Sequence, residues 1–326
     1  MANPLPDISV VLPAHNEAGN IAPMAAALTA LLKPLGRFEI VFVDDGSDDG
    51  TLAAIRAAAA TDPCIRYLSF TRNFGHQAAL RAGLRHARGR GVIVMDCDFE
   101  HPPELIPQLL AAWHDGARIV VTRRDDGEAD LPAVKRVTSR LYYRVLDAIG
   151  DVSIEPGSAD FMLLDRSVVD TVNGLQDQDV FLRALVRWLG FPMTSIAFSR
   201  GARIHGDSKY TLRRMIDLAV TGIAAHSVRP LRLAIWLALG LAAFGLLLLV
   251  YTVFSYFFVP GTLHGWTSVM ATIAILGAAQ LLVLGIIGEY VGRILREARG
   301  RPTYIVAETE ADRERGAVTP LKQPAE

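Results

Sequence analysis

The chain has 326 residues, and its 33 Lys and Arg against 34 Asp and Glu give a formal net charge of −1. This balance leaves no overall basic field to attract nucleic acid, and the length suits one large domain or two units. Hydrophobic residues make up 51% of the chain and charged residues 21%, a composition that excludes a disordered protein. Two cysteines, Cys64 and Cys97, are too few for a disulfide framework or a four-cysteine zinc site.

Residues 1–206 alternate short apolar runs with helix-like stretches. The apolar runs predict strands at 8–12, 40–43, 65–70, 92–95 and, more briefly, 119–121. The stretches between them predict helices over 18–32, 48–60, 76–88 and 103–114. Strands that alternate with helices indicate an α/β domain with a mostly parallel sheet covered on both faces. Such sheets bind their ligands beyond the carboxyl ends of the strands.

Polar residues follow three of these apolar runs, where the predicted strands end. The polar segments contain Pro13, Asn16 and Glu17 after the first run, Asp44, Asp45 and Ser47 after the second, and Asp96, Asp98 and Glu100 after the fourth. The Asp-x-Asp pair offers hard oxygen ligands to Mg²⁺ or Mn²⁺, and such an ion can bridge a substrate diphosphate. The alternative interpretation is a polar loop that caps the following helix.

Three further residues near these segments have competing interpretations. Ser47 is also a candidate N-cap for the helix expected from residue 48. His76 lies at a predicted helix start, where packing is favoured over contact with a ligand. Cys97 lies between two candidate ligands, but strand alternation turns it away from both, so we interpret it as structural. The first strand is followed by neither Gly-x-Gly-x-x-Gly nor a Walker sequence, which disfavours dinucleotide cofactors and P-loop chemistry.

Candidate acceptor-side residues lie further along the chain. Asp160 precedes another apolar run and is either a base, a residue that orients an acceptor, or an ordinary carboxylate at a strand edge. The segment 198–210 is basic and interrupted by glycine, and its Arg203 and Lys209 can hold phosphate or attract anionic lipid. Residues 207–232 form a candidate juxtamembrane amphipathic segment.

Two long apolar runs follow, at 233–259 and 266–288, and neither contains a charged residue. Each is long enough as a helix to span a bilayer, and the short link between them requires an antiparallel hairpin. The alternative, two buried core helices, is disfavoured by such long uncharged runs. Because arginines flank only the outer ends, the positive-inside rule places both termini in the cytoplasm. We expect residues 289–326 to form a cytoplasmic tail that is disordered from about residue 307.

The motifs occur in the order of a known family. They are LPAHNE, VDDGSDDGT, TRNFGHQAALRAGL, MDCDFEHPPE, SADFMLLDR and RGARIHGDSKY. With the two C-terminal spans, they resemble the family-2 inverting glycosyltransferases that act on polyprenyl phosphates. The resemblance covers about residues 7–300. It implies a glycosyltransferase A-type fold, a nucleotide-sugar donor, a polyprenyl (undecaprenyl) phosphate acceptor, and Mg²⁺ or Mn²⁺ as cofactor.

The same resemblance implies roles for individual residues. The nucleotide-sugar would be bound by Pro13, Asn16, Glu17, Asp44, Asp45, Ser47 and Asp96. The metal would be held by Asp96 and Asp98, with Glu100 at a position where the family commonly has Gln. The lipid phosphate or the diphosphate would be contacted by Arg123, Arg136, Arg200, Arg203 and Lys209. The residues implied in catalysis are Asp160, Asp98 and Lys209.

The implied reaction is one in-line displacement, in which a lipid phosphate oxygen attacks the anomeric carbon and the configuration inverts. Since phosphate is largely ionised at pH 7, with a second pKa of about 6, a strong base is not required. UDP-glucose is the first choice of donor, and GDP-mannose and UDP-N-acetylhexosamine are alternatives. Other classes are a processive polysaccharide synthase and an inactive scaffold for a lipid-sugar flippase. The expected location is the cytoplasmic (inner) membrane, and a homo-oligomer is a further hypothesis.

Overall fold

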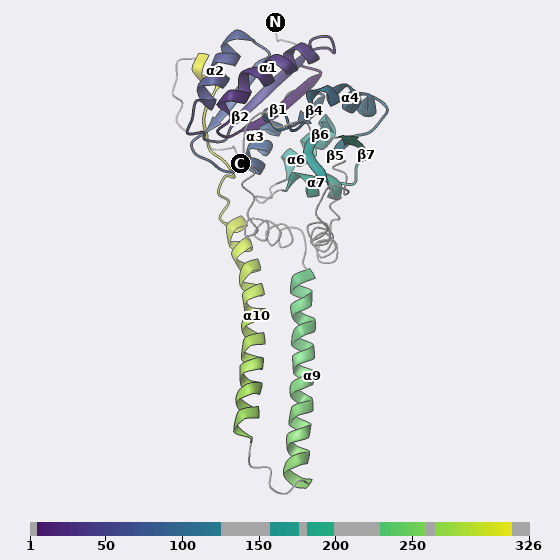
Figure 1. Cartoon of the computed structure of the whole chain (residues 1–326), viewed down its shortest axis with the longest axis vertical. Coiled ribbons are helices and arrows are strands. Elements are labelled where there is room, and N and C mark those ends of the chain that lie inside the picture. Colours follow the sequence, from purple (N-terminus) through teal and green to yellow (C-terminus); the bar gives the residue numbers. More distant parts are fainter. Residues whose placement is uncertain (1–4, 125–156, 176–180, 199–228, 259–264, 315–326) are drawn as a thin grey trace, which may run out of the picture. The chain divides into compact units, whose positions relative to one another are not determined.

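The computed structural model describes residues 5–124, 157–175, 181–198, 229–258 and 265–314 (Figure 1). The chain divides into two compact units. The first, the sheet unit, comprises Met1–Arg144, Ser153–Thr211 and Pro302–Glu326. The second, the hairpin unit, comprises Val145–Val152 and Leu212–Arg301.

One eight-stranded sheet organises the sheet unit, in the order β7-β5-β6-β4-β1-β2-β3-β8. The strands are β1 Ile8–Ala14, β2 Phe38–Asp44, β3 Ile65–Phe70, β4 Gly91–Val94, β5 Ile119–Arg124, β6 Ser158–Asp165, β7 Met193–Phe198 and β8 Val306–Thr309. Neighbours are parallel except where β6 meets β4 and β5 and where β8 meets β3. The predicted α/β fold is confirmed, and its sheet is mixed, because β6 and β8 run antiparallel to their neighbours.

Helices cover both faces of this sheet, because its central strands are apolar on both sides. They are α1 Ala18–Leu32, α2 Thr51–Thr61, α3 His76–His86, α4 Ile106–His114 after the short 3₁₀ turn η1 Pro103–Leu105, α6 Arg166–Gly174 and α7 Leu182–Trp188. Val10 and Leu12 of β1 belong to the core cluster that includes residues of α1, α2 and α4. The next residue, Val11, belongs to the cluster that includes residues of α3, α6 and α7. This alternation follows the two-residue period of a strand.

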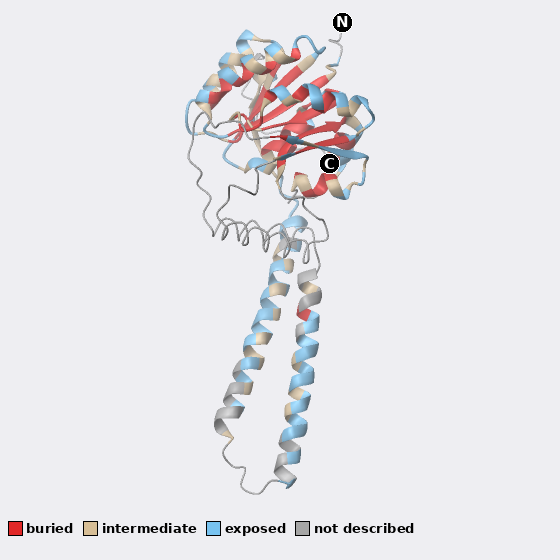
Figure 2. Cartoon of the chain, turned by 45° about the vertical axis from the view of Figure 1, so that its right-hand side comes forward, coloured by how far each residue is buried: buried red, intermediate tan, exposed pale blue. Residues whose placement is uncertain are grey.

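A close approach brings α3 against the centre of the sheet. A Cβ added at Gly83 of α3 would lie 2.2 Å from Cγ1 of Val11. Only glycine leaves room for this packing, which places the start of α3 near the carboxyl ends of the central strands. The buried residues gather in the strands and the inner faces of these helices (Figure 2).

The chain returns to the sheet unit after the second long helix. There β8 pairs with β3, and the short helix α11 Glu310–Glu314 follows. Glu308 pairs with Arg56 at 2.5 Å, and Glu310 pairs with Arg66 at 2.7 Å. Our expectation of disorder from residue 307 is therefore wrong for residues 307–314, because their acidic side chains bind arginines of the sheet unit. Residues 315–326 lie outside the described residues.

The hairpin unit contains two long helices that contact each other, α9 Arg229–Phe258 and α10 Trp266–Ala298. Both contain a segment long and apolar enough to cross a membrane, Ala234–Tyr251 and Ile275–Ala298. Their described side chains are mostly exposed, as the pale blue ribbon in Figure 2 shows, which argues against the alternative of two buried core helices. Helix α10 continues beyond the predicted span end at residue 288, and the exact membrane boundary stays a prediction.

Candidate functional site

The predicted polar segments come together at the carboxyl ends of β1, β2 and β4. These strands are adjacent and parallel, so their ends lie at one edge of the sheet. Strand β6 runs antiparallel to β4, with Val94 opposite Met162. This register brings Asp160, near the start of β6, level with Asp96, just beyond the end of β4. Two carboxylates that are distant in sequence are thereby placed side by side.

The loops after β1 and β2 bind each other through hydrogen bonds. The Asn16 amide donates to Ser47 Oγ at 3.0 Å, and the Asp48 amide donates to Asn16 Oδ1 at 3.0 Å. The Glu17 amide donates to Thr51 Oγ1 at 2.8 Å. Helix α2 begins at Thr51, later than expected, so the interpretation of Ser47 as its N-cap is wrong. Ser47 instead connects the two loops.

Asp44, at the end of β2, is a support for the turn that follows it. Its side chain is 1% exposed. Ser69 Oγ donates to Asp44 Oδ2 at 2.7 Å, and the Ser47 amide donates to Oδ1 at 3.2 Å. Pro13 is likewise buried, within β1. Asp44 and Pro13, both predicted to bind the nucleotide, are therefore buried parts of the strand ends and support the loops that follow.

Asp45 holds the loop of residues 71–75, which follows β3. The Phe74 amide donates to Asp45 Oδ1 at 2.7 Å, and the Gly75 amide donates to Oδ2 at 3.0 Å. Burial raises the pKa of Asp45, although these two hydrogen bonds act in the opposite direction. Gly46 has a φ of 60°, and a Cβ there would lie 2.2 Å from the carbonyl carbon of Arg72. Only glycine allows the Asp45 turn and this loop to touch.

The Asp96–Asp98 turn differs from the Asp44–Asp45 turn in its exposure and in the charges around it. The side chain of Asp96 is 33% exposed, and the Glu100 amide donates to Asp98 Oδ1 at 3.0 Å. Burial raises the pKa of Asp98, and the negative charges of Asp96 and Glu100 raise it further. A divalent cation would relieve this repulsion.

These two carboxylates suit a divalent ion that takes part of its ligands from the protein and the rest from a substrate. Among the described residues, the structure shows no group of three or more His, Cys, Asp or Glu arranged to hold a metal. Mg²⁺ is commonly held by one or two carboxylates, with water and substrate phosphates as its other ligands. Asp96 and Asp98 therefore suit an ion that arrives with a diphosphate.

Glu100, the third predicted metal ligand, forms an ion pair with Arg124. It is buried, and Arg124 Nη2 lies 3.4 Å from its Oε2. Its role as a metal ligand stays a prediction. Cys97 is 2% exposed and belongs to the core, in agreement with a structural role.

Asp160 forms a bidentate ion pair. Arg183 of α7 donates from Nε to Oδ1 at 2.5 Å and from Nη2 to Oδ2 at 2.6 Å. Burial would raise the pKa of Asp160, but the hydrogen bonds of Arg183 and His76 outweigh it and hold the pKa far below its ordinary value. A carboxylate that stays ionised in this way is a weak proton acceptor. The geometry therefore favours an orienting role for Asp160 over that of a base.

His76, the first residue of α3, lies between the two aspartates. Its Nε2 is 3.4 Å from Asp160 Oδ2 and 3.8 Å from Asp96 Oδ1. Burial disfavours its charged form, but the hydrogen bond to Asp160 and the charge of Asp96 raise its pKa overall. His76 therefore does more than pack, because its ring lies near both carboxylates, and its contact with a ligand stays a prediction.

Sequence reasoning missed His101 and Arg183. His101 is buried, and its Nδ1 accepts a hydrogen bond from the Asp96 amide at 3.0 Å. Its ring stacks on Phe161 with centroids 5.4 Å apart, and burial lowers its pKa, which favours the neutral form. Nothing local marks Arg183, because it lies in helix α7 and its partner, Asp160, lies in strand β6. The position of His101 shortly after the Asp-x-Asp pair was the one available signal.

The predicted phosphate-binding residues are mostly beyond the described part of the chain. Arg123 is exposed near the end of β5, where it lies opposite Ser158 of β6. Outside the described residues lie Arg136, Arg200, Arg203 and Lys209. Their roles stay predictions.

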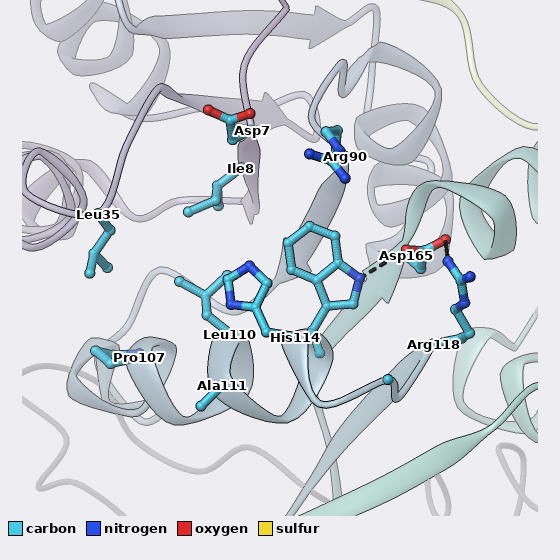
Figure 3. A pocket seen from close by; sticks show the side chains of 12 residues that line it. Asp7, Ile8, Leu35, Arg90, Pro107, Leu110, Ala111, His114, Arg118 and Asp165 are labelled. Atoms are coloured by element: carbon cyan, nitrogen blue, oxygen red, sulfur yellow. Dashed lines mark hydrogen bonds and ion pairs between the residues drawn. The ribbon is translucent and has the colours of Figure 1, made fainter.

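A hollow of about 690 Å³ lies at the opposite ends of the strands (Figure 3). Trp113 Nε1 donates to Asp165 Oδ2 at 2.8 Å, and Arg118 pairs with Asp165 Oδ1 at 2.9 Å. These polar groups satisfy one another, and none of the predicted site residues that the structure describes lines the hollow. The hollow is separate from the candidate site at the carboxyl ends of β1, β2 and β4.

Known proteins are similar in sequence to this chain over most of its length. The SfII prophage-derived bactoprenol glucosyl transferase of Shigella flexneri is 36% identical over 301 residues, which cover 92% of this chain and 97% of that protein. The uncharacterised glycosyltransferase YkcC of Bacillus subtilis (strain 168) is 35% identical over 299 residues, covering 91% and 92%. Among solved structures, mannosyl-3-phosphoglycerate synthase from Rubrobacter xylanophilus has a TM-score of 0.48 at 19% identity, covering 68% of this chain and 72% of that one.

Two family descriptions match successive parts of the sequence. Residues 229–294 match the GtrB C-terminal hairpin, which coincides with α9 and most of α10. Residues 9–172 match Glycosyl transferase family 2, and they contain both acidic turns and Asp160. With relatives above 30% identity over most of its length, the chain belongs to glycosyl transferase family 2 and carries the C-terminal hairpin of the GtrB type.

Proposed function

We propose that this glycosyltransferase moves a hexose from a nucleotide-sugar to a polyprenyl phosphate at the cytoplasmic face of a membrane. The observation that carries the proposal is the convergence of Asp96, His76 and Asp160 at the carboxyl edge of the sheet. That arrangement provides a donor side and an acceptor side in one place. Relatives named bactoprenol glucosyl transferases, and the two long apolar helices, support a lipid-linked acceptor.

The donor side would be formed by the loops after β1, β2 and β4. Asp44, Asp45 and Ser47 hold these loops in place, which leaves the exposed Asn16 and the half-buried Glu17 to contact the nucleotide. Asp96 and Asp98 would hold Mg²⁺ or Mn²⁺, which would supply positive charge to the leaving diphosphate.

The acceptor side would be organised around Asp160. An acceptor phosphate is already largely ionised at pH 7, because its second pKa is about 6. Its oxygen can form the new bond to the anomeric carbon as the bond to the diphosphate oxygen breaks, with inversion and without a general base. Arg183 and a protonated His76 offset the charge of Asp160, so that the site accepts an anionic head group.

A lipid acceptor also accounts for the apolar hairpin. We infer that residues 233–259 and 266–288 are the spans, that both termini are cytoplasmic, and that the protein is a multi-pass protein of the inner membrane. UDP-glucose is the proposed donor, and GDP-mannose or UDP-N-acetylhexosamine would require the same chemistry.

The test is transfer of radiolabelled sugar from each of these donors to undecaprenyl phosphate by the full-length protein in detergent. We expect one donor to give a single-sugar lipid product with Mg²⁺ or Mn²⁺, and no product with EDTA. Asp98→Ala should abolish the product. The exposed Asp170→Asn is the matched control, since it removes a carboxylate of α6 outside the site. Products with several sugars would instead indicate a processive synthase, and no product with any donor would contradict the proposal.

A further inference from the structure

We propose that residues 302–314, here called the return segment, position the donor site through Tyr304 and the loop of residues 71–75. The inference rests on the proposed function, because it assigns a task to loops placed around the nucleotide. In this scheme, the part of the chain that follows the hairpin completes a site built from the first third of the sequence.

The return segment is firmly bound to the edge of the sheet. Strand β8 pairs with β3, and Glu308 accepts hydrogen bonds from Arg56 at 2.8 Å and from the Tyr67 hydroxyl at 3.1 Å. Glu310 accepts one from Arg66 at 2.7 Å. Charge-assisted bonds between partly buried groups are the stronger kind of hydrogen bond. The segment is thus a built part of the sheet unit.

Just before β8, the return segment contacts the end of β3 and the loop that follows it. The ring of Tyr304 stacks on Phe70 with centroids 5.0 Å apart and planes 16° apart. Phe70 meets Phe74 edge to face at 5.7 Å. The Thr71 amide donates to the Ile305 carbonyl at 3.0 Å. An aromatic row and a backbone hydrogen bond therefore join Tyr304 and Ile305 to the loop.

This loop in turn holds groups of the candidate site. Its Phe74 and Gly75 amides bind the Asp45 carboxylate, and its backbone touches Gly46. The loop ends at His76, whose ring lies near both Asp96 and Asp160. A shift of Phe74 would therefore disturb the Asp45 turn at one end and His76 at the other.

The consequence is a donor site that is complete only when the chain beyond α10 has bound to β3. The ligand most affected is the nucleoside diphosphate portion of the donor, because the loop is bonded directly to the Asp45 turn. Tyr304 is a positioning residue in this scheme, since it acts through Phe70 and Phe74.

The experiment compares full-length Tyr304→Ala with the matched control Tyr304→Phe, which keeps the stacked ring. Binding of UDP and of GDP in the presence of Mn²⁺ is measured by calorimetry, and KM is measured for both substrates. We expect Tyr304→Ala to weaken nucleotide binding about two- to tenfold, as expected for the loss of one aromatic pair. Tyr304→Phe should bind as the wild type does. In Tyr304→Ala the KM for undecaprenyl phosphate should rise less than the KM for the donor, because Phe74 bonds directly to Asp45 and reaches His76 only through Gly75.

Hydrogen exchange without nucleotide tests the same link independently of activity. In Tyr304→Ala the Phe74 and Gly75 amides should exchange faster, while amides of β1 should not change. If Tyr304→Ala does not fold, Tyr304→Leu, which keeps an apolar side chain without the ring, takes its place.

The outcomes separate the two proposals. A wild-type protein that binds neither nucleotide and makes no lipid product would overturn both. A wild-type protein that is active, with a Tyr304→Ala variant of unchanged nucleotide affinity and unchanged exchange at Phe74, would overturn the positioning role alone. Equal losses for donor and acceptor would also overturn it, because they would indicate general destabilisation.

Discussion

The two acidic turns at the edge of the sheet contain the same residue type and differ in what surrounds it. In the Asp44–Asp45 turn, hydroxyl and amide donors occupy the buried carboxylates. In the Asp96–Asp98 turn, one carboxylate is a third exposed and the other is crowded by negative charge. The first turn therefore resembles a structural support and the second a cation site. The position of a carboxylate after a strand therefore does not predict its role, which depends on the hydrogen-bond donors and charges around it.

Asp98→Asn should have the largest effect on activity. Removing one of the two carboxylates should lower kcat about a thousandfold, which is roughly 4 kcal/mol of transition-state stabilisation. Folding should be unimpaired, because the change relieves repulsion from Asp96. Steady-state kinetics and thermal unfolding measure both quantities.

A thermal shift with Mn²⁺ and UDP supplies the control for this variant. Ligands should raise the Tm of the wild type but not that of Asp98→Asn, because a ligand stabilises only the state that binds it. A variant with kcat within tenfold of the wild type would refute the assignment of this turn as the cation site.

Arg183→Ala tests a third kind of environment, in which a buried carboxylate is satisfied by a cation. It should lower the free energy of unfolding by about 3 kcal/mol at pH 7, because it leaves the Asp160 charge buried without its main partner. The cost should be smaller at pH 4.

The sign follows from the pKa of Asp160, which is held below its unfolded value of about 4 in the wild type. The stability from this pair is present above pH 4 and declines only as the pH falls below it. In Arg183→Ala, burial instead favours the protonated acid, so the variant loses stability as the pH rises from 4 to 7. Unfolding curves at both pH values check this, and a pH-independent difference would contradict it.

Asp45→Ala should affect folding more than the chemical step. It leaves the Phe74 and Gly75 amides without their acceptor, which should cost about 2 kcal/mol of unfolding free energy. The donor KM should rise, while kcat at saturating donor should fall far less than in Asp98→Asn. If kcat instead fell as far as in Asp98→Asn, the contrast between the two turns would be lost.

Ser47→Ala should have the smallest effect. It removes one acceptor for the Asn16 amide, worth about 1 kcal/mol. A donor KM raised by no more than about fivefold, with unchanged kcat, is expected from that loss. Kinetics at several donor concentrations measure it, and a large fall in kcat would mean that Ser47 contacts the reacting groups.

Much of the sheet and part of the site were predictable from local patterns. Continuous apolar runs correctly located the strands around Val10, Val41 and Ile93, because a strand covered on both faces needs apolar residues at every position. The acidic segments after these runs also lie at one edge, as parallel neighbours require. Strand β8 was missed, since its Glu308 pairs with Arg56, which is distant in sequence.

Local sequence was thus enough for the α/β order, for the two apolar helices and for the acidic residues at strand ends, since each depends on periodicity or composition within a short window. Long-range pairing was needed for everything that distinguishes one acidic residue from another. The antiparallel placement of β6 brings Asp160 to Asp96, and the return of the chain at β8 brings Tyr304 to Phe70. The physical reason is that a carboxylate's charge state and role depend on its burial and its partners, which only the folded chain brings together.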